Sequence, residues 1–81
     1  MTVRVKLFAM LKDAAGVGEC RLTLAPHANG LDAREALVAQ HPRLRDVIPV
    51  ARLALNHEYR SWETPLGEGD ELALVMPVSG G

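Results

Sequence analysis

The residues best suited to chemistry stand at the C-terminal end of the chain, in the segment Pro77-Val78-Ser79-Gly80-Gly81. Two glycines have no Cβ atoms, so they form a backbone narrow enough to enter a tunnel, and they leave the Gly81 carboxylate unshielded. Pro77 has no N–H group to donate, so it should end a sheet and project the residues after it. Such an end suits activation of the carboxylate in another enzyme's active site. Taken alone, however, two terminal glycines are explained slightly better by a frayed terminus.

Elsewhere the potentially reactive side chains form no recognised motif. The histidines lie in separate predicted loops or turns without metal-ligand spacing, so we expect surface side chains and no metal site. Cys20 alternates with Leu22 and Leu24, which indicates a small buried side chain and a poor nucleophile. The serines lack a nucleophile-elbow context, and the glycine pair is too short for a phosphate loop. The histidines are His27, His41 and His57, the serines are Ser61 and Ser79, and the glycine pair is Gly67 and Gly69. The sequence therefore predicts no internal active site.

The element that leads into this tail is predicted at residues 71–76, where Glu71 precedes five apolar residues. Such a run is typical of a central strand covered on much of both faces. Alternating residues and flanking turn formers predict the other strands. These strands are expected at residues 2–8, 19–24, 51–56 and, as a short extended return, 59–62.

Two segments are predicted to be helical. Residues 9–15 are rich in helix formers and stop at Gly16. The main helix is expected to have Asp32 as its cap, with Glu35 three residues later, and to end at Pro42. Residues 43–50 show no clear pattern.

The elements follow the order strand, helical turn, strand, helix, strand, short strand, strand. If the first and last strands pair side by side, the helix must cross the sheet, which gives an α+β fold of the β-grasp type. We expect a mixed sheet of four to five strands with one main helix crossing it. The domain is predicted over residues 1–76, with a flexible tail over residues 77–81.

Phe8 lies on the face of its predicted strand that also carries Arg4 and Lys6. An apolar patch that contains an aromatic residue suggests a partner surface. Packing of Phe8 under residues 9–15 explains it about equally well. The residues that could join Phe8 on this face are either Ala73 and Val75 or Leu74 and Met76, together with Tyr59, and the alternation does not decide between the pairs.

The composition excludes several classes of function. The formal net charge is −1, so there is no electrostatic case for binding nucleic acid or an anionic membrane. Apolar runs are too short to span a bilayer. Apolar residues make up 48% and charged residues 23%, which is typical of a globular domain. The lone Cys20 favours a reducing, cytoplasmic location.

Three segments together resemble the small subunit of molybdopterin synthase, the MoaD family. They are LFAMLKDAAG at residues 7–16, LALNHEYR at residues 53–60 and TPLGEGDELALVMPVSGG at residues 64–81. The last segment is the most specific, because a turn, an apolar strand, a proline and two glycines follow in a fixed order. Met76 departs from the family, which commonly has a second proline at this position. The departure therefore affects the expected path of the tail.

The resemblance implies a ubiquitin-like β-grasp fold and a role in sulfur carriage. A MoeB-like E1 activating enzyme would adenylate the Gly81 carboxylate with ATP, and a sulfur donor would convert the adenylate to a thiocarboxylate. The tail would then enter a MoaE-like large subunit and give its sulfur to precursor Z (cyclic pyranopterin monophosphate). The implied assembly is a heterotetramer with two copies of each subunit. The large subunit would supply the catalytic residues, and no cofactor would be bound permanently.

The family's functional residues map onto this sequence by position. Gly81 would carry the adenylate and then the thiocarboxylate, and Gly80 would give clearance. Pro77, Val78 and Ser79 would form the inserted stalk. The positions that resemble the partner-binding residues of the family are Phe8, Lys12, Tyr59 and Val75.

Two other functions remain open on the sequence. The chain could be a sulfur carrier for thiamine or for tRNA thiolation, or a ubiquitin-like modifier joined to lysines through Gly81, since those relatives also end in two glycines. It could also be a plain interaction module with an incidental tail.

Overall fold

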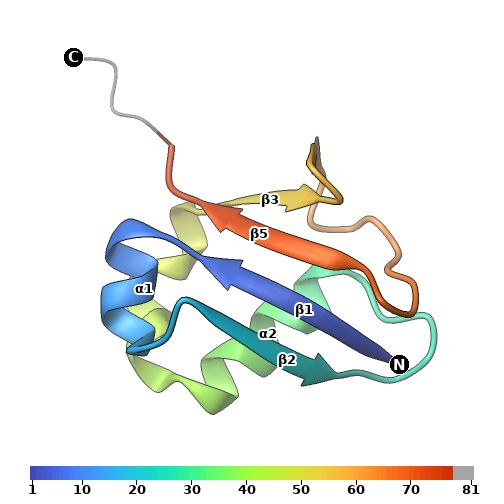
Figure 1. Cartoon of the computed structure of the whole chain (residues 1–81), viewed down its shortest axis with the longest axis horizontal. Helices are drawn as coiled ribbons and strands as arrows, with labels where there is room; N and C mark the ends of the chain where they lie inside the picture. Colours follow the sequence, from blue (N-terminus) through green and yellow to red (C-terminus); the bar gives the residue numbers. More distant parts are fainter. Residues whose placement is uncertain (78–81) are drawn as a thin grey trace.

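A computed structural model of the chain describes residues 1–77. Five strands form one mixed sheet in the order β2-β1-β5-β3-β4 (Figure 1). The strands β1 and β5 run parallel at the centre, and the three other neighbouring pairs are antiparallel. The strands are β1 (Thr2–Leu7), β2 (Glu19–Thr23), β3 (Arg52–Leu55), β4 (Glu58–Arg60) and β5 (Glu71–Val75). The predicted α+β fold of the β-grasp type is confirmed.

The two central strands pair because both place apolar side chains on the same face of the sheet. Val5 lies beside Leu72 and Leu7 beside Leu74 in the register. All four side chains are almost completely buried. A shift of one residue would turn these side chains to the opposite face, so burial fixes the register.

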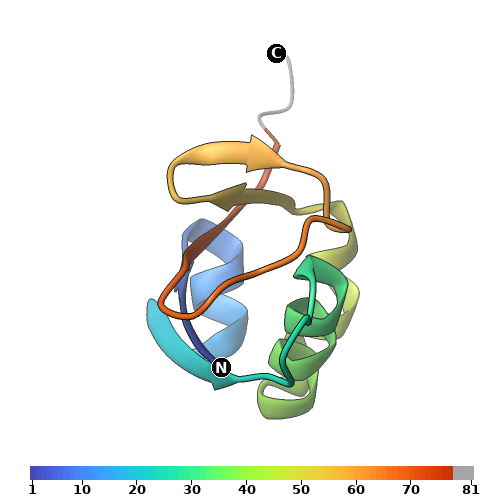
Figure 2. The ribbon, with the colours of Figure 1, turned by 90° about the vertical axis from the view of Figure 1, so that its right-hand side faces the viewer.

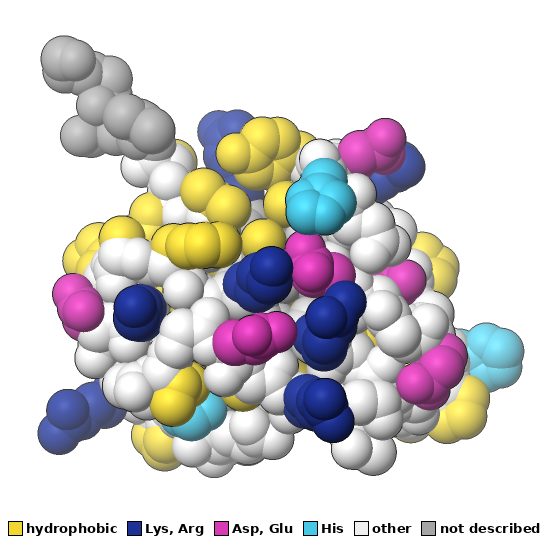
Figure 3. All heavy atoms as spheres, in the orientation of Figure 1, with side chains coloured by type: hydrophobic (Ala, Val, Ile, Leu, Met, Phe, Trp, Pro, Cys, Tyr) yellow, Lys and Arg dark blue, Asp and Glu magenta, His cyan; other side chains and the backbone are white. Residues whose placement is uncertain are grey.

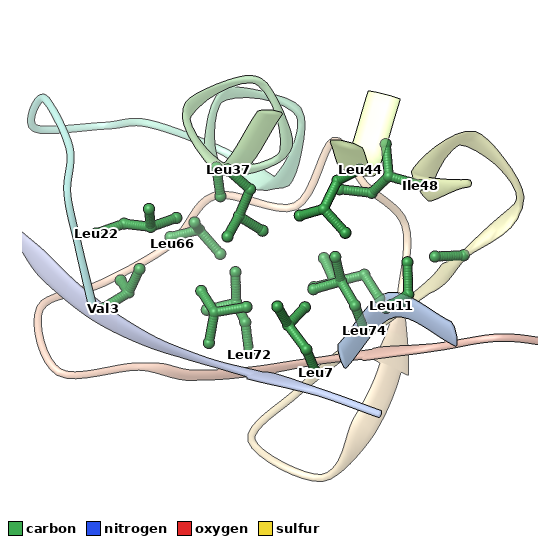
Figure 4. Close-up of a cluster of buried hydrophobic side chains, with 14 of the residues drawn as sticks. Val3, Leu7, Leu11, Leu22, Leu37, Leu44, Ile48, Leu66, Leu72 and Leu74 are labelled. Atoms are coloured by element: carbon green, nitrogen blue, oxygen red, sulfur yellow. The ribbon is translucent and has the colours of Figure 1, made fainter. Parts of the chain in front are cut away.

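The helices all cover one face of the sheet, as Figures 1 and 2 show from two directions. They are α1 (Ala9–Ala15), α2 (Gly30–Gln40) and the 3₁₀ helices η1 (Pro42–Asp46) and η2 (Ile48–Val50). Leu37, Leu44 and Ile48 point from this layer toward the leucines of the sheet (Figure 4). No helix within residues 1–77 is long and apolar enough to cross a membrane.

No helix within residues 1–77 covers the opposite face of the sheet, which corrects the expectation for the last strand. β5 is central, but only Leu72 and Leu74 are covered, whereas Ala73 and Val75 stay partly exposed on the other side. The apolar run therefore reflects one packed face and one face left open.

The start of the main helix also differs from the sequence prediction. Asn29, rather than Asp32, is the N-cap residue, and the helix begins at Gly30. The Asp32 N–H donates to Asn29 Oδ1 at 3.0 Å, and the Asn29 N–H donates to Asp32 Oδ2 at 2.9 Å. This reciprocal pair is a capping box one turn earlier than the expected pair of Asp32 and Glu35.

The region after this helix is more regular than predicted. Residues 42–50 contain η1 and η2, and the Leu44 and Ile48 side chains anchor them in the core. Prolines stand at the first turn of each helix, where a missing N–H costs nothing. The short return strand covers Glu58–Arg60 rather than residues 59–62, because the turn before it contains only Asn56 and His57.

Gly30 is expected to be essential for the packing of α2. A Cβ added there would lie 2.6 Å from the Trp62 carbonyl oxygen and 2.8 Å from Leu53 Cδ2. The Trp62 carbonyl cannot easily move, because it accepts a hydrogen bond from the Leu31 N–H at 2.9 Å. We expect Gly30→Ala to lower the free energy of unfolding in urea by about 1–3 kcal/mol.

The matched control is Gly18→Ala. The nearest atoms to its added Cβ belong to the flexible Lys12 side chain, at 3.4 Å and beyond. We expect a change within about 0.5 kcal/mol, as for an ordinary surface substitution. Equal losses in the two variants would contradict this account of Gly30.

Candidate functional site

The described residues end two positions after the last residue of β5. The strand stops at Val75, and Met76 and Pro77 continue outside any strand, with Pro77 exposed. Because β1 and β5 are parallel, both end at the same edge of the sheet (Figure 1). The residues predicted to react or to form the stalk beyond Pro77 are Val78, Ser79, Gly80 and Gly81, and they lie outside the described residues.

An apolar strip crosses the open face next to this edge. It consists of Phe8, Ala54, Tyr59, Ala73 and Val75. Ala54 lies beside both Ala73 and Tyr59 in the strand registers, and the extended backbone of Phe8 continues β1 one step beyond the pair of Leu7 and Leu74. Hydrophobic side chains gather in this part of the open face in Figure 3. The structure thus selects Ala73 and Val75, not Leu74 and Met76, as the outward pair.

The two aromatic residues of the apolar strip are its most exposed members. Phe8 is 50% exposed and Tyr59 is 66% exposed. Phe8 is the N-cap residue of α1 and lies outside the buried core, so the alternative that it packs under residues 9–15 is wrong. Exposed aromatic rings on an apolar surface are typical anchors of protein interfaces.

The β3–β4 hairpin positions Tyr59 through a two-residue turn. Asn56 and His57 both have positive φ angles, 49° and 72°, as a tight turn with the twist of a hairpin requires. The Asn56 N–H donates to the Glu71 carbonyl oxygen at 2.8 Å, and Asn56 Oδ1 accepts from the Glu71 N–H at 3.0 Å. The backbone N–H and the side-chain oxygen of Asn56 therefore both bind the turn to Glu71 of β5.

The rest of the open face is charged and centred on Glu71. Its carboxylate lies 3.6 Å from Arg4 Nη2, 3.6 Å from Lys6 Nζ and 3.5 Å from His57 Nε2. The Glu71 side chain is only 16% exposed, so its neighbours shield it from solvent. One carboxylate thus lies between the two cations Arg4 and Lys6 on this face.

Lys12 lies one helical turn along α1 from Phe8. Its N–H reaches the Phe8 carbonyl oxygen at 3.3 Å, and its side chain passes beside Gly18. Residues four apart share one side of a helix, so Phe8 and Lys12 can face a common partner. The partner-binding roles of Phe8, Lys12, Tyr59 and Val75 remain predictions.

Arg52 was missed by the sequence analysis. It lies beside Val75 in the register and lines a groove of about 280 Å³ together with Tyr59, Val75, Met76 and Pro77. Its position next to the tail depends on how β3 pairs with β5, and no local pattern reveals that pairing. The outward position of residues 52 and 54 in an alternating strand was the only signal available.

The His and Cys candidates of the described chain lie outside the apolar strip. Within residues 1–77 no three His, Cys, Asp or Glu side chains are placed to hold a metal ion. Cys20 lies beside Val5 and packs against the core while remaining partly exposed. Burial raises the pKa of the Cys20 thiol, and the neighbouring Glu19 carboxylate raises it further.

Comparison with known proteins agrees with this geometry. A family model described as the ThiS family matches residues 5–81. The chain belongs to the ThiS family. It is 36% identical over 83 residues to the molybdopterin synthase sulfur carrier subunit of Chlamydomonas reinhardtii, and the alignment covers 100% of both sequences.

Two solved structures are similar over their full length. The crystal structure of small archaeal modifier protein 1 from Haloferax volcanii matches with a TM-score of 0.92 and 34% identity, covering 100% of both chains. A chain in the complex of subunits 1 and 2 of the molybdopterin-converting factor from Helicobacter pylori matches with a TM-score of 0.71 and 26% identity, again covering 100% of both. The resemblance to the small subunit of molybdopterin synthase is confirmed.

The state of Cys20 gives a test of this part of the fold. Because the pKa of its thiol is raised, the folded chain holds less thiolate at a given pH than the unfolded chain. We expect iodoacetamide to alkylate Cys20 more slowly in the native protein than in urea at mildly alkaline pH. As the pH rises from the ordinary pKa of a thiol through the raised pKa of Cys20, the native state should lose stability. Equal alkylation rates in the two states would contradict this placement.

Proposed function

We propose that this chain is the sulfur-carrying subunit of a molybdopterin synthase. The observation that carries the proposal is the full-length similarity to the algal sulfur carrier subunit. The family match also extends through the two glycines to residue 81. Pro77, exposed at the end of the sheet, is a suitable place for a projecting segment to begin.

The proposed chemistry takes place on the Gly81 carboxylate. In a MoeB-like activating enzyme, a carboxylate oxygen attacks the α-phosphorus of ATP, a P–O bond forms and pyrophosphate leaves. A donor then supplies sulfur at the oxidation level of sulfide, which attacks the acyl carbon while AMP departs. The resulting thiocarboxylate carries one sulfur in place of one oxygen. Activation is needed because a carboxylate is a poor electrophile, whereas AMP is a good leaving group.

The second stage takes place in a MoaE-like large subunit, to which we assign the catalytic residues. The tail inserts there and donates its sulfur to precursor Z, and two rounds build the dithiolene of molybdopterin. We propose a heterotetramer with two copies of each subunit, in the cytoplasm, without a permanently bound cofactor in this chain. The Helicobacter pylori complex of subunits 1 and 2 supports the pairing with a large subunit.

The apolar strip is the proposed docking surface for the large subunit. It lies at the same edge of the sheet as the start of the tail, so a partner that covers Phe8 and Tyr59 also lies next to Pro77. Docking on these side chains would reduce the freedom of the tail relative to the active site, which favours the transfer step.

A second candidate function is conjugation to other proteins. It is favoured by the close structural match to small archaeal modifier protein 1. In that case a lysine amine rather than a sulfur nucleophile would displace AMP from the activated Gly81. Sulfur carriage for thiamine or tRNA thiolation would use the same first step. A pull-down separates these functions, because recovery of a MoaE-like subunit supports the first and lysine-linked adducts support the second.

The proposed chemistry is tested by intact mass spectrometry. After co-expression with a MoeB-like enzyme and a sulfur donor, we expect the mass to change by the replacement of one oxygen with sulfur. Deletion of Gly81 should abolish this change and leave the melting temperature nearly unaltered. If the wild-type chain stays unmodified with every E1-like enzyme supplied, the proposal is wrong.

Phe8→Ala tests the docking surface. Because Phe8 is half exposed, we expect the free energy of unfolding to fall by less than about 1 kcal/mol. The Kd for the large subunit should rise at least about tenfold, as for an aromatic anchor. Val50→Ala is the control, since Val50 is 58% exposed on the helical layer and should change neither quantity. A larger effect of Phe8→Ala on folding than on binding would contradict the assignment.

A further inference from the structure

The groove at the end of β5 combines one charged side chain with residues from three strands. Tyr59 comes from β4, Arg52 from β3, and Val75, Met76 and Pro77 from the end of β5 and the residues after it. Its volume of about 280 Å³ is enough for one or two side chains. Arg52 is the one charged residue among these lining residues. The groove therefore places a guanidinium group among mostly apolar side chains.

Arg52 and Arg21 differ from the other cations of the sheet because neither has an ion-pair partner among the described residues, and only Arg52 lies beside the end of β5, since Arg21 belongs to the edge strand β2. Arg4 and Lys6 contact Glu71, and Arg60 Nη2 lies 2.6 Å from Glu58 Oε2. Among residues 1–77, by contrast, no carboxylate lies within 4.0 Å of the Arg52 guanidinium. An exposed guanidinium beside apolar side chains favours a complementary anion over water when a partner excludes the solvent.

We propose that this groove receives a carboxylate side chain of the activating enzyme, and that Arg52 is a positioning residue for activation of the tail. The inference rests on the proposed function, because it assigns the partner through the activation step. The planar guanidinium group can hold both oxygens of a carboxylate, which a lysine amine cannot do. Tyr59 and Val75 belong both to the groove and to the apolar strip, so the activating enzyme and the large subunit would use overlapping surfaces at successive stages.

The position of the groove favours a protein carboxylate over a phosphate of ATP. Pro77 forms part of the groove wall, and the reacting carbon of Gly81 lies four residues further along the chain. Drawn out in an active site, four residues span up to about 14 Å. ATP that reacts at Gly81 would then lie beyond Arg52. A contact at Arg52 instead fixes the point where the tail starts, which helps to align its far end.

The test compares two charge reversals in the full chain, Arg52→Glu and Arg45→Glu. Arg45 is also exposed but lies in η1 on the helical layer, and both variants change the net charge equally. The assay is ATP–pyrophosphate exchange by the E1-like enzyme that adenylates the wild-type chain. We expect Arg52→Glu to raise the KM for the chain about tenfold or more with little change in kcat, and Arg45→Glu to change KM less than about twofold. Arg52→Lys should fall between the wild type and Arg52→Glu.

Three results would overturn the inference while the wild type remains active. Equal KM values for the two charge reversals would show that only net charge matters. A fall in kcat without a change in KM would place Arg52 in the chemical step rather than in docking. In the free chain, shifts of the Gly80 and Gly81 amide NMR signals by Arg52→Glu would show that the tail itself occupies the groove. If no E1-like enzyme adenylates the wild type, the proposed function fails instead, and the partner assigned to the groove fails with it.

Discussion

The parallel pairing of β1 with β5 is the interaction on which the rest of the structure depends. It brings the first and last strands to the centre of the sheet and buries valine and leucine side chains from both against the helices. Because the two strands are parallel, their C-terminal ends lie at one edge. Phe8 and Val75 therefore stand near the start of the tail, although they are far apart in the sequence. The candidate site is a direct result of this pairing.

The one-sided helical layer determines what the domain can present to a partner. All four helical segments pack on the same face, so the other face keeps both the apolar strip and the charged group around Glu71. This open face is continuous with Met76 and Pro77 through the groove. The exposed apolar side chains and the start of the tail segment are thereby placed on one side of a small domain.

Much of the fold could be predicted from local patterns. The alternation in residues 2–8 and the apolar run at residues 71–76 correctly indicated the two central strands. The prediction was wrong at the start of α2, where Asn29 rather than Asp32 is the N-cap through a local capping box. It also missed the 3₁₀ helices of Leu44 and Ile48, whose side chains are held in the core. Tertiary packing overrides weak propensity in such short segments.

In the candidate site, too, some residues could be predicted from the sequence and others could not. Phe8 and Tyr59 could be named from residue type and resemblance, and their exposure agrees with a surface role. Arg52 could not, because its place beside Val75 follows from the register between β3 and β5. The choice of Ala73 and Val75 as the outward pair likewise required the helical layer to be placed on one side of the sheet.

The central pairing also has a consequence for how the chain folds. β1 is made first and β5 last among the strands, so β1 must wait for its inner neighbour until nearly the whole described chain has been synthesised. Pairing of strands far apart in the sequence first loses the conformational entropy of the closed loop and only then gains stabilising contacts, which slows folding. Until β5 arrives, the buried side chains of β1 have no cover on that side. The domain should therefore fold as one cooperative unit, in which the strand that leads to the tail completes the core.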